Sequence, residues 1–232
     1  TVIAQAVSGI GIAAYTFLRR PELRITFGDL CPDRSALREI IRFSFLTCIQ
    51  QSVMNFGILL VQGLVNTFGT TVMAAFAAAV KIDSFAYMPA QDFGNAFSTF
   101  VAQNYGAGQK ERIRRGSRCA FLLSAAFCLL ISAAVFVLAE PLMQLFVSAQ
   151  EAEVIRIGAQ YLRIEGAFYV GIGLLFLLYG YYRAVRKPGM SLILTLISLA
   201  LRVALAYIMA TLIGETGIWL SVPIGWAVAD MA

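Results

Sequence analysis

The sequence predicts an all-α polytopic membrane protein with about seven transmembrane helices, on the strength of three observations. Of the 232 residues, 59% are hydrophobic and only 13% are charged, whereas an average soluble domain carries roughly 25% charged residues. The apolar residues form runs close to the length of about 20 residues that crosses a bilayer as a helix. The cations collect in the links between these runs, so the net charge of +5 indicates membrane topology and not binding to nucleic acid.

The apolar runs follow one another along the whole chain. They cover residues 1–18, 43–67, 71–104, 119–138, 158–182, 190–213 and 217–232. The first run starts without an initiator Met and without the basic segment of a signal peptide, and the last run is short for a crossing. We therefore expect the chain to be a piece of a longer protein.

The links between the runs alternate between basic and non-basic. Those after the first, third and fifth runs are rich in Arg and Lys, as in RIRRGSR at residues 112–118, whereas those after the second, fourth and sixth are not. Because basic links stay in the cytoplasm, the first helix is predicted to run from outside to inside. The long link at residues 19–42 is predicted to be a cytoplasmic linker in which residues 33–42 form an amphipathic piece along the membrane surface.

Enzyme and cofactor signals are absent from the sequence. It has no histidine, no phosphate-binding G-x-x-x-x-G-K-[ST] loop and no G-x-S-x-G elbow. We therefore expect no enzyme activity, no ATP hydrolysis by this chain and no cofactor. The cysteines lack the paired spacing of a metal site, and we expect free thiols at Cys31, Cys48, Cys119 and Cys128.

Polar residues inside the apolar runs are the candidate site residues. An ionisable group there costs roughly 2.5–3.5 kcal/mol, so it normally faces a bundle interior or a water-filled cavity. The second run carries four amides on one helical face, at Gln51, Asn55, Gln62 and Asn66. They either line a cavity or hydrogen-bond to neighbouring helices.

The third run contains several ionisable groups. One of its faces carries Lys81, Met88, Asp92, Asn95 and Thr99. Asp83 points almost oppositely, and Pro89 is a candidate for a kink. Lys81 and Asp92 lie about 16 Å apart along the helix and cannot pair with each other. Each needs another partner, either a permanent one on a neighbouring helix or a transported ion or ligand.

The fifth run places Glu165 on a stripe of mostly aromatic residues, Tyr161, Tyr169, Ile172, Phe176 and Tyr179. A carboxylate among aromatic rings suits an organic cation, because the charge attracts it and the ring faces add cation–π contact. Helix packing or lipid contact also produces aromatic stripes.

The sixth run carries polar residues on one face, at Ser191, Thr195, Ser198 and Arg202. Four ionisable groups lie roughly 10–17 Å from the outer ends of their helices, namely Lys81, Asp83, Glu165 and Arg202. We hypothesise that they meet in one layer, with Glu165 or Asp83 as the titratable member.

These stretches resemble the multidrug and toxic compound extrusion (MATE) transporters. KIDSFAYMPAQDFGNAFSTFVAQNYGAGQKERIRRG resembles the eighth helix of that family and the loop after it. LLVQGLVNTFGTTVMAAFAAA resembles the end of the seventh helix and the start of the eighth, YGYYRAVRKPGMSL the exit of the tenth, and GIWLSVPIGWAVAD the twelfth. The ordered set covers essentially the whole chain.

The resemblance implies a fold of twelve helices in two six-helix lobes. Residues 1–18 would be the sixth helix, the last of a truncated N-terminal lobe, and residues 43–232 the C-terminal six-helix transport lobe. The partners would be small amphipathic substrates, membrane lipids and the missing N-terminal lobe of the same chain. The activity would be efflux of amphipathic, often cationic compounds by alternating access across a membrane, here a bacterial plasma membrane, driven by inward flow of sodium ions or protons.

Some members of the family pair an acid on the seventh helix with one on the tenth to bind a cation. Here the seventh-helix region offers Gln50, Gln51 and Asn55 but no carboxylate, while Glu165 lies on the tenth helix. The residues therefore do not match a sodium site of that design. In other members the coupling acid is on the first helix, which this piece does not contain, so sodium and proton coupling both stay open. A lipid-linked oligosaccharide flippase of the same superfamily and a non-transporting scaffold or half-transporter are the alternative functions.

Overall fold

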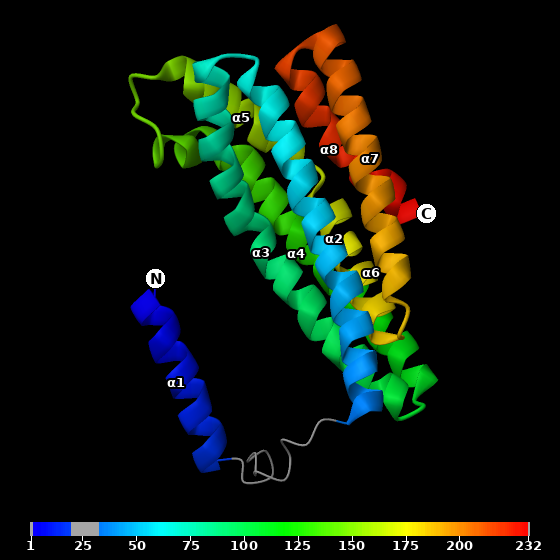
Figure 1. Ribbon diagram of the computed structural model, residues 1–232. Coiled ribbons are helices and arrows are strands. Elements are labelled where there is room, and N and C mark those ends of the chain that lie inside the picture. The colour runs from blue at the N-terminus through cyan, green and yellow to red at the C-terminus, as the bar shows by residue number, and fades with distance from the viewer. Residues whose placement is uncertain (1, 20–32, 232) are drawn as a thin grey trace. The chain divides into compact units, whose positions relative to one another are not determined.

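The computed structural model describes residues 2–19 and 33–231 (Figure 1). The described residues form helices joined by short turns and contain no strand, which confirms the predicted all-α class. The chain divides into two compact units, Thr1–Ser44 and Phe45–Ala232, and each unit is described by itself.

The first unit holds helix α1, Val2–Arg19, and the first turns of α2, Arg34–Asn66. Residues 34–42, part of the stretch predicted to lie along the membrane surface, form the first turns of α2, which continues to Asn66. No Gly or Pro interrupts residues 34–56, so the helix runs on without a break. The Asp33 carboxylate also accepts the Ser35 N–H at 2.9 Å, as a residue at a helix start does. The rest of the predicted linker, residues 20–32 with Cys31, lies outside the described residues.

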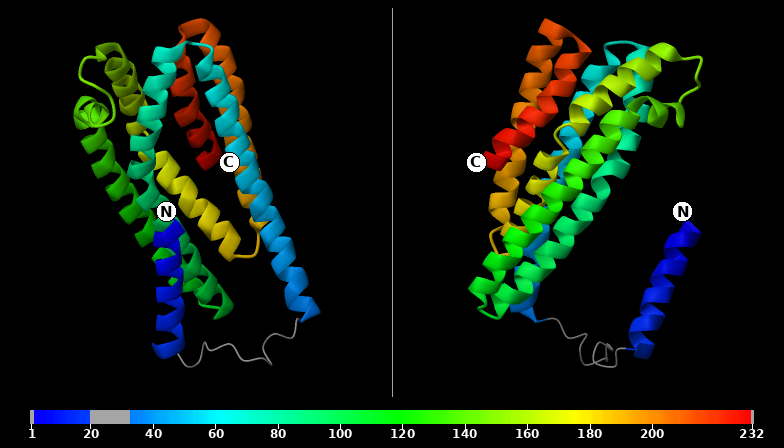
Figure 2. Two further views of the ribbon diagram at one scale, coloured as in Figure 1. Left: turned by 60° about the vertical axis from the view of Figure 1, so that its left-hand side comes forward. Right: turned by 180° about the vertical axis from the view of Figure 1, so that it is seen from behind.

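The second unit is a helical bundle (Figures 1 and 2). After α2 it contains α3 (Thr70–Gly106), α4 (Lys110–Gln144), α5 (Ala152–Gly166), α6 (Tyr169–Ala184), α7 (Pro188–Ile213) and α8 (Glu215–Met231). Helices α7 and α8 pack together as a hairpin, while α3 packs against α4, α5 and α6. Pro89 lies inside α3 without ending it.

Within the described part of the chain, five helices are long and apolar enough to cross a membrane: α1, α2, α3, α4 and α7. The bent pair α5–α6 would make a sixth span. The seventh predicted run is α8, a helix of 17 residues.

The fifth apolar run is not one helix, as the sequence predicted, but two. Helix α5 ends at Gly166, α6 begins at Tyr169, and the two are bent by 53°. Gly166 weakens a helix interior because it lacks a side chain, and a Cβ there would lie only 3.2 Å from Val135 of α4. The chain therefore passes close to α4 at the point where it bends.

The core of the second unit contains a group of three aromatic side chains from different helices. Phe76 of α3 stacks on Trp219 of α8 with ring centroids 5.4 Å apart, and Tyr161 of α5 meets both rings edge-on. All three side chains are buried. This group joins α3, α5 and α8 beside the cavity described below.

Helices α3 and α6 approach closely at two glycines. A Cβ on Gly180 would lie 2.6 Å from the carbonyl oxygen of Gly94, and one on Gly94 would lie 3.0 Å from the carbonyl oxygen of Phe176. Such backbone approach is typical of helix pairs in membranes, where small residues allow close packing.

We predict that Gly180→Ala lowers the stability of the bundle by about 1–3 kcal/mol, because the added methyl group meets backbone that cannot move aside. The measurement is the thermal unfolding temperature in detergent. Gly63→Ala in α2 is the matched control, since a Cβ there has no neighbour within 4 Å and Ala favours a helix interior. An equal loss of stability in both variants would contradict the close-packing argument.

Candidate functional site

A cavity of about 220 Å³ lies in the second unit and is lined from α2, α3, α5, α6, α7 and α8. Most of the predicted site residues line it, namely Gln51, Asn55, Asp83, Tyr161, Glu165 and Arg202. The helical faces anticipated from the sequence therefore bring distant residues to one place, although the helix of the fifth run is broken.

Asp83 projects from the middle of α3 into the bundle. Its side chain is buried, and its Oδ1 accepts a hydrogen bond of 2.6 Å from the Tyr169 hydroxyl. Tyr169 is itself buried and stands in the first turn of α6, directly after the bend. The bond therefore holds the carboxylate against the start of α6.

Glu165 stands in the last turn of α5, directly before the bend. It is only 1% exposed, and its buried Oε1 has no hydrogen-bond partner among the described residues. A buried carboxylate oxygen without a partner is unfavourable. This oxygen can therefore bind a cation or accept a proton.

Arg202 of α7 provides the one cationic side chain in the lining of the cavity. Its buried Nε has no hydrogen-bond partner in the part of the chain that the structure describes, nor is it in an ion pair with either carboxylate there. Two acidic groups thus share the cavity with a single guanidinium. If all three are ionised, one negative charge is left over.

Aromatic rings form much of the remaining wall. They are Phe76, Tyr87, Tyr161, Phe176, Tyr179 and Trp226. Their faces allow cation–π contact in a desolvated site, whereas Tyr161 also brings a hydroxyl. The mixed wall can hold either a small inorganic cation near the carboxylates or an organic cation against the rings.

Gln50 is a buried polar residue that was not among the candidate site residues. Its Nε2 donates to Thr195 Oγ1 at 3.0 Å, and its Oε1 accepts from the Ser191 hydroxyl at 2.9 Å. The polar stripe of the sixth run thus finds its partner in α2. The need of Ser191 and Thr195 for a polar partner is the signal in the sequence, but it does not distinguish Gln50 from its neighbour Gln51.

Lys81 and Asp92 do not join the cavity. Both lie on the exposed face of α3, because each is turned about 160–180° around the helix from Asp83. The prediction that Lys81 meets the other three ionisable groups is therefore wrong. Gln62 and Asn66 of α2 are exposed as well.

A smaller cavity of about 50 Å³ adjoins the first and shares several lining residues with it, including Gln51, Gln91 and Tyr179. Arg183, near the end of α6, also lines it and donates a hydrogen bond of 3.2 Å to Asn95 Oδ1. Among the described residues, no group of three or more His, Cys, Asp or Glu side chains could hold a metal ion. Cys48, Cys119 and Cys128 are free thiols.

Comparison with known proteins assigns the chain to a family. The family model described as MatE matches residues 44–208, most of the chain. The chain belongs to the MatE family. It is 27% identical, over 95% of its own length, to the probable multidrug resistance protein NorM of Thermotoga maritima, and 29% identical, over 86%, to the probable multidrug resistance protein YpnP of Bacillus subtilis. It covers 47% and 44% of those two proteins, so it spans about half the length of these relatives.

Solved structures of MOP superfamily transporters share the fold. A MOP superfamily transporter from Pyrococcus furiosus matches the whole chain with a TM-score of 0.91 at 24% identity, and the chain covers 52% of it. An outward-facing multidrug resistance MATE transporter matches with a TM-score of 0.90 at 23% identity, also over 52% of its length. The chain therefore has the fold of half a MATE transporter, as the sequence predicted. It is an integral membrane protein of a family whose members are in general not enzymes.

We predict that Tyr169→Phe destabilises the chain by about 1–3 kcal/mol, because the buried Asp83 carboxylate loses its hydrogen-bond donor. Thermal unfolding in detergent measures the change. Tyr207→Phe is the matched control, since the Tyr207 side chain is half exposed on α7. Equal stability of the two variants would show that the 2.6 Å bond contributes nothing.

Proposed function

We propose that the chain is the C-terminal transport lobe of a cation-coupled multidrug exporter, and that Asp83 and Glu165 bind the coupling cation. The observation that carries the proposal is the shared cavity with two buried carboxylates and one guanidinium. Names of the relatives support it, since NorM of Thermotoga maritima and YpnP of Bacillus subtilis are probable multidrug resistance proteins. These relatives are bacterial, which favours a bacterial plasma membrane.

The charge balance of the cavity favours a monovalent cation. In a low-dielectric interior, an uncompensated charge is costly. One proton or one sodium ion brings the set of Asp83, Glu165 and Arg202 to neutrality. Either ion can bind at the unpartnered Oε1 of Glu165, so the same residues support sodium or proton coupling.

The exposed polar residues of α2 and α3 support a second lobe. Gln51, Asn55, Lys81 and Asp92 are all exposed in the described chain. Polar and charged groups at this depth are costly against lipid tails. We assign Gln51 and Asn55, which also line the cavity around Asp83, to the wall of a water-filled substrate cavity whose other wall is the N-terminal lobe. Lys81 and Asp92, on the opposite side of α3, would likewise face water or protein and not lipid.

Among functions for this fold, a lipid-linked oligosaccharide flippase is less well supported than a multidrug exporter. A pyrophosphate needs several cations, which act as its hydrogen-bond donors. The cavity offers Arg202 alone against Asp83 and Glu165. In a non-transporting scaffold, buried charge without a partner would lower stability and serve no function.

We predict that Asp83→Asn and Glu165→Gln each reduce ethidium efflux by the complete transporter to background in proteoliposomes, under an imposed sodium gradient and under a pH gradient. The amides keep the side-chain shape but remove the charge that binds the cation. Glu153→Gln is the control, since Glu153 pairs with Arg156 on the exposed surface and should leave efflux unchanged. Full efflux in both Asp83→Asn and Glu165→Gln would overturn the assignment.

We predict that the chain alone binds the coupling ion but does not transport. One lobe supplies only one wall of the substrate cavity, whereas the bundle around Asp83 and Glu165 lies within one unit. Binding of radioactive sodium, or proton uptake when sodium does not bind, is measured on the purified chain. Ion-coupled efflux by the chain alone would contradict the two-lobe proposal.

A further inference from the structure

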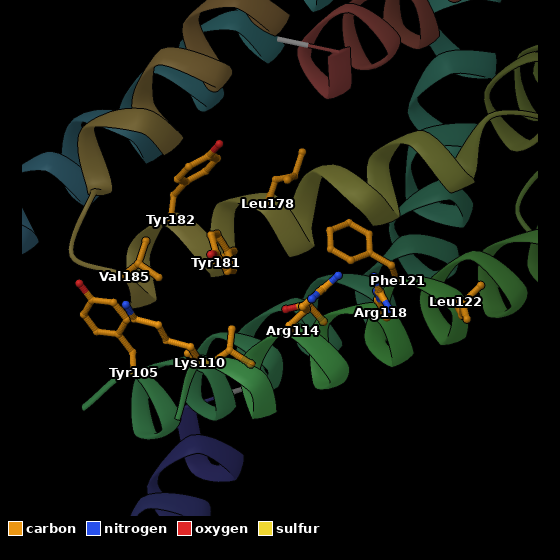
Figure 3. Close-up of a pocket in the computed structure, with 12 residues that line it drawn as sticks. Tyr105, Lys110, Arg114, Arg118, Phe121, Leu122, Leu178, Tyr181, Tyr182 and Val185 are labelled. Atoms are coloured by element: carbon orange, nitrogen blue, oxygen red, sulfur yellow. The ribbon is translucent and has the colours of Figure 1, made fainter. Parts of the chain in front are cut away.

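A second, larger cavity lies apart from the one around Asp83. It has a volume of about 940 Å³ and lies between the start of α4 and the ends of α3 and α6 (Figure 3). Its lining residues are Tyr105, Lys110, Ile113, Arg114, Ser117, Arg118, Phe121, Leu122, Leu178, Tyr181, Tyr182 and Val185. The two cavities share no lining residue. We call the second one the α4–α6 groove.

Three cations line one side of the α4–α6 groove. Lys110, Arg114 and Arg118 follow one another at intervals of four residues, which places them on one face of α4. None of them is in an ion pair or side-chain hydrogen bond within the described part of the chain, and no acidic residue is among the lining residues. The groove is therefore a concentrated positive site without a counterion from the protein.

The neighbouring cations of α4 behave differently. Arg115 pairs with Glu111 at 2.9 Å, and neither Arg112 nor Arg115 lines the groove. The same two turns of helix thus carry cations inside and outside the groove. Lining the α4–α6 groove is therefore a property of Lys110, Arg114 and Arg118 and not of every cation in this basic link.

Polarity changes along the groove. Figure 3 shows Tyr105 and Lys110 at one end, then Arg114 and Arg118, and then Phe121 and Leu122 at the other end. On the opposite wall, α6 contributes tyrosines beside the cations and Leu178 beside Phe121. A ligand that fits this sequence of surfaces carries a negative charge at one end and an apolar chain at the other.

The groove also lies at the level of the cytoplasmic lipid headgroups, where ligands with a charged end and an apolar chain are found. Lys110, Arg114 and Arg118 belong to a basic link, which the positive-inside rule places at the cytoplasmic surface. The apolar part of α4 begins directly after them, so the cations stand at the level of the lipid headgroups. Tyrosine is typical of this level.

The groove wall also contains a polar group without a partner. The buried hydroxyl of Ser117 has no hydrogen-bond partner among the described residues.

We propose that the α4–α6 groove binds an anionic phospholipid of the cytoplasmic leaflet. Lys110, Arg114 and Arg118 contact the phosphate and the charged headgroup, because basic pockets between membrane helices attract anionic lipids. Leu122, Phe121 and Leu178 contact the first part of an acyl chain. This proposal does not depend on the proposed transport function.

Native mass spectrometry of the purified chain in detergent tests the proposal with phosphatidylglycerol and phosphatidylcholine of identical acyl chains. We expect phosphatidylglycerol to be retained and phosphatidylcholine to be lost. The double variant Arg114→Gln/Arg118→Gln should weaken retention of phosphatidylglycerol by about tenfold or more. The matched double variant Arg112→Gln/Arg115→Gln removes the same charge outside the groove and should change retention by less than about twofold.

Three results would overturn the proposal. Equal retention of the two lipids would show that the headgroup is not recognised. Equal losses in the two double variants would show diffuse attraction to the basic link. Displacement of phosphatidylglycerol by millimolar inorganic phosphate would show a site for a free anion. Arg114→Lys/Arg118→Lys keeps the charges and should restore most of the retention, so a loss of retention through misfolding is distinguished from a loss of charge.

Discussion

Buried charge is the constraint on which the second unit depends. An ionised carboxylate in the bundle is tolerated only when hydrogen-bond donors or cations surround it. Asp83 meets this condition through the Tyr169 hydroxyl at 2.6 Å, whereas the Oε1 of Glu165 has no hydrogen-bond partner among the described residues. Among the described residues, the Tyr169–Asp83 hydrogen bond therefore fixes α6 relative to α3 by electrostatics as well as by packing.

The bend between α5 and α6 joins the two acids into one site. Glu165 is the last acidic residue before the bend and Tyr169, the donor to Asp83, is the first residue of α6. Close contact between Gly94 and Gly180 holds α6 against α3, which carries Asp83. Interrupted helices with polar groups at the break are typical of ion sites in transporters, because the freed backbone faces a cavity and not lipid.

The sequence predicted the helices and most of the site for simple physical reasons. Apolar runs and alternating basic links follow from the bilayer itself, and Asp83, Glu165 and Arg202 stand out because charge is rare in such runs. Which of the neighbouring amides Gln50 and Gln51 turns inward depends on the rotation of α2, which one sequence does not specify. The bend was missed because the apolar pattern continues across Gly166.

The bend has a further consequence for how the sequence can vary. Short breaks between helices are usually places where chains accept extra residues. Here, one residue added between Gly166 and Tyr169 would lengthen the break and displace the Glu165 carboxylate relative to Tyr169, the donor to Asp83. The segment is therefore free to change its side chains, since Phe168 is half exposed, but not its length, because it sets the distance between Glu165 and the donor to Asp83.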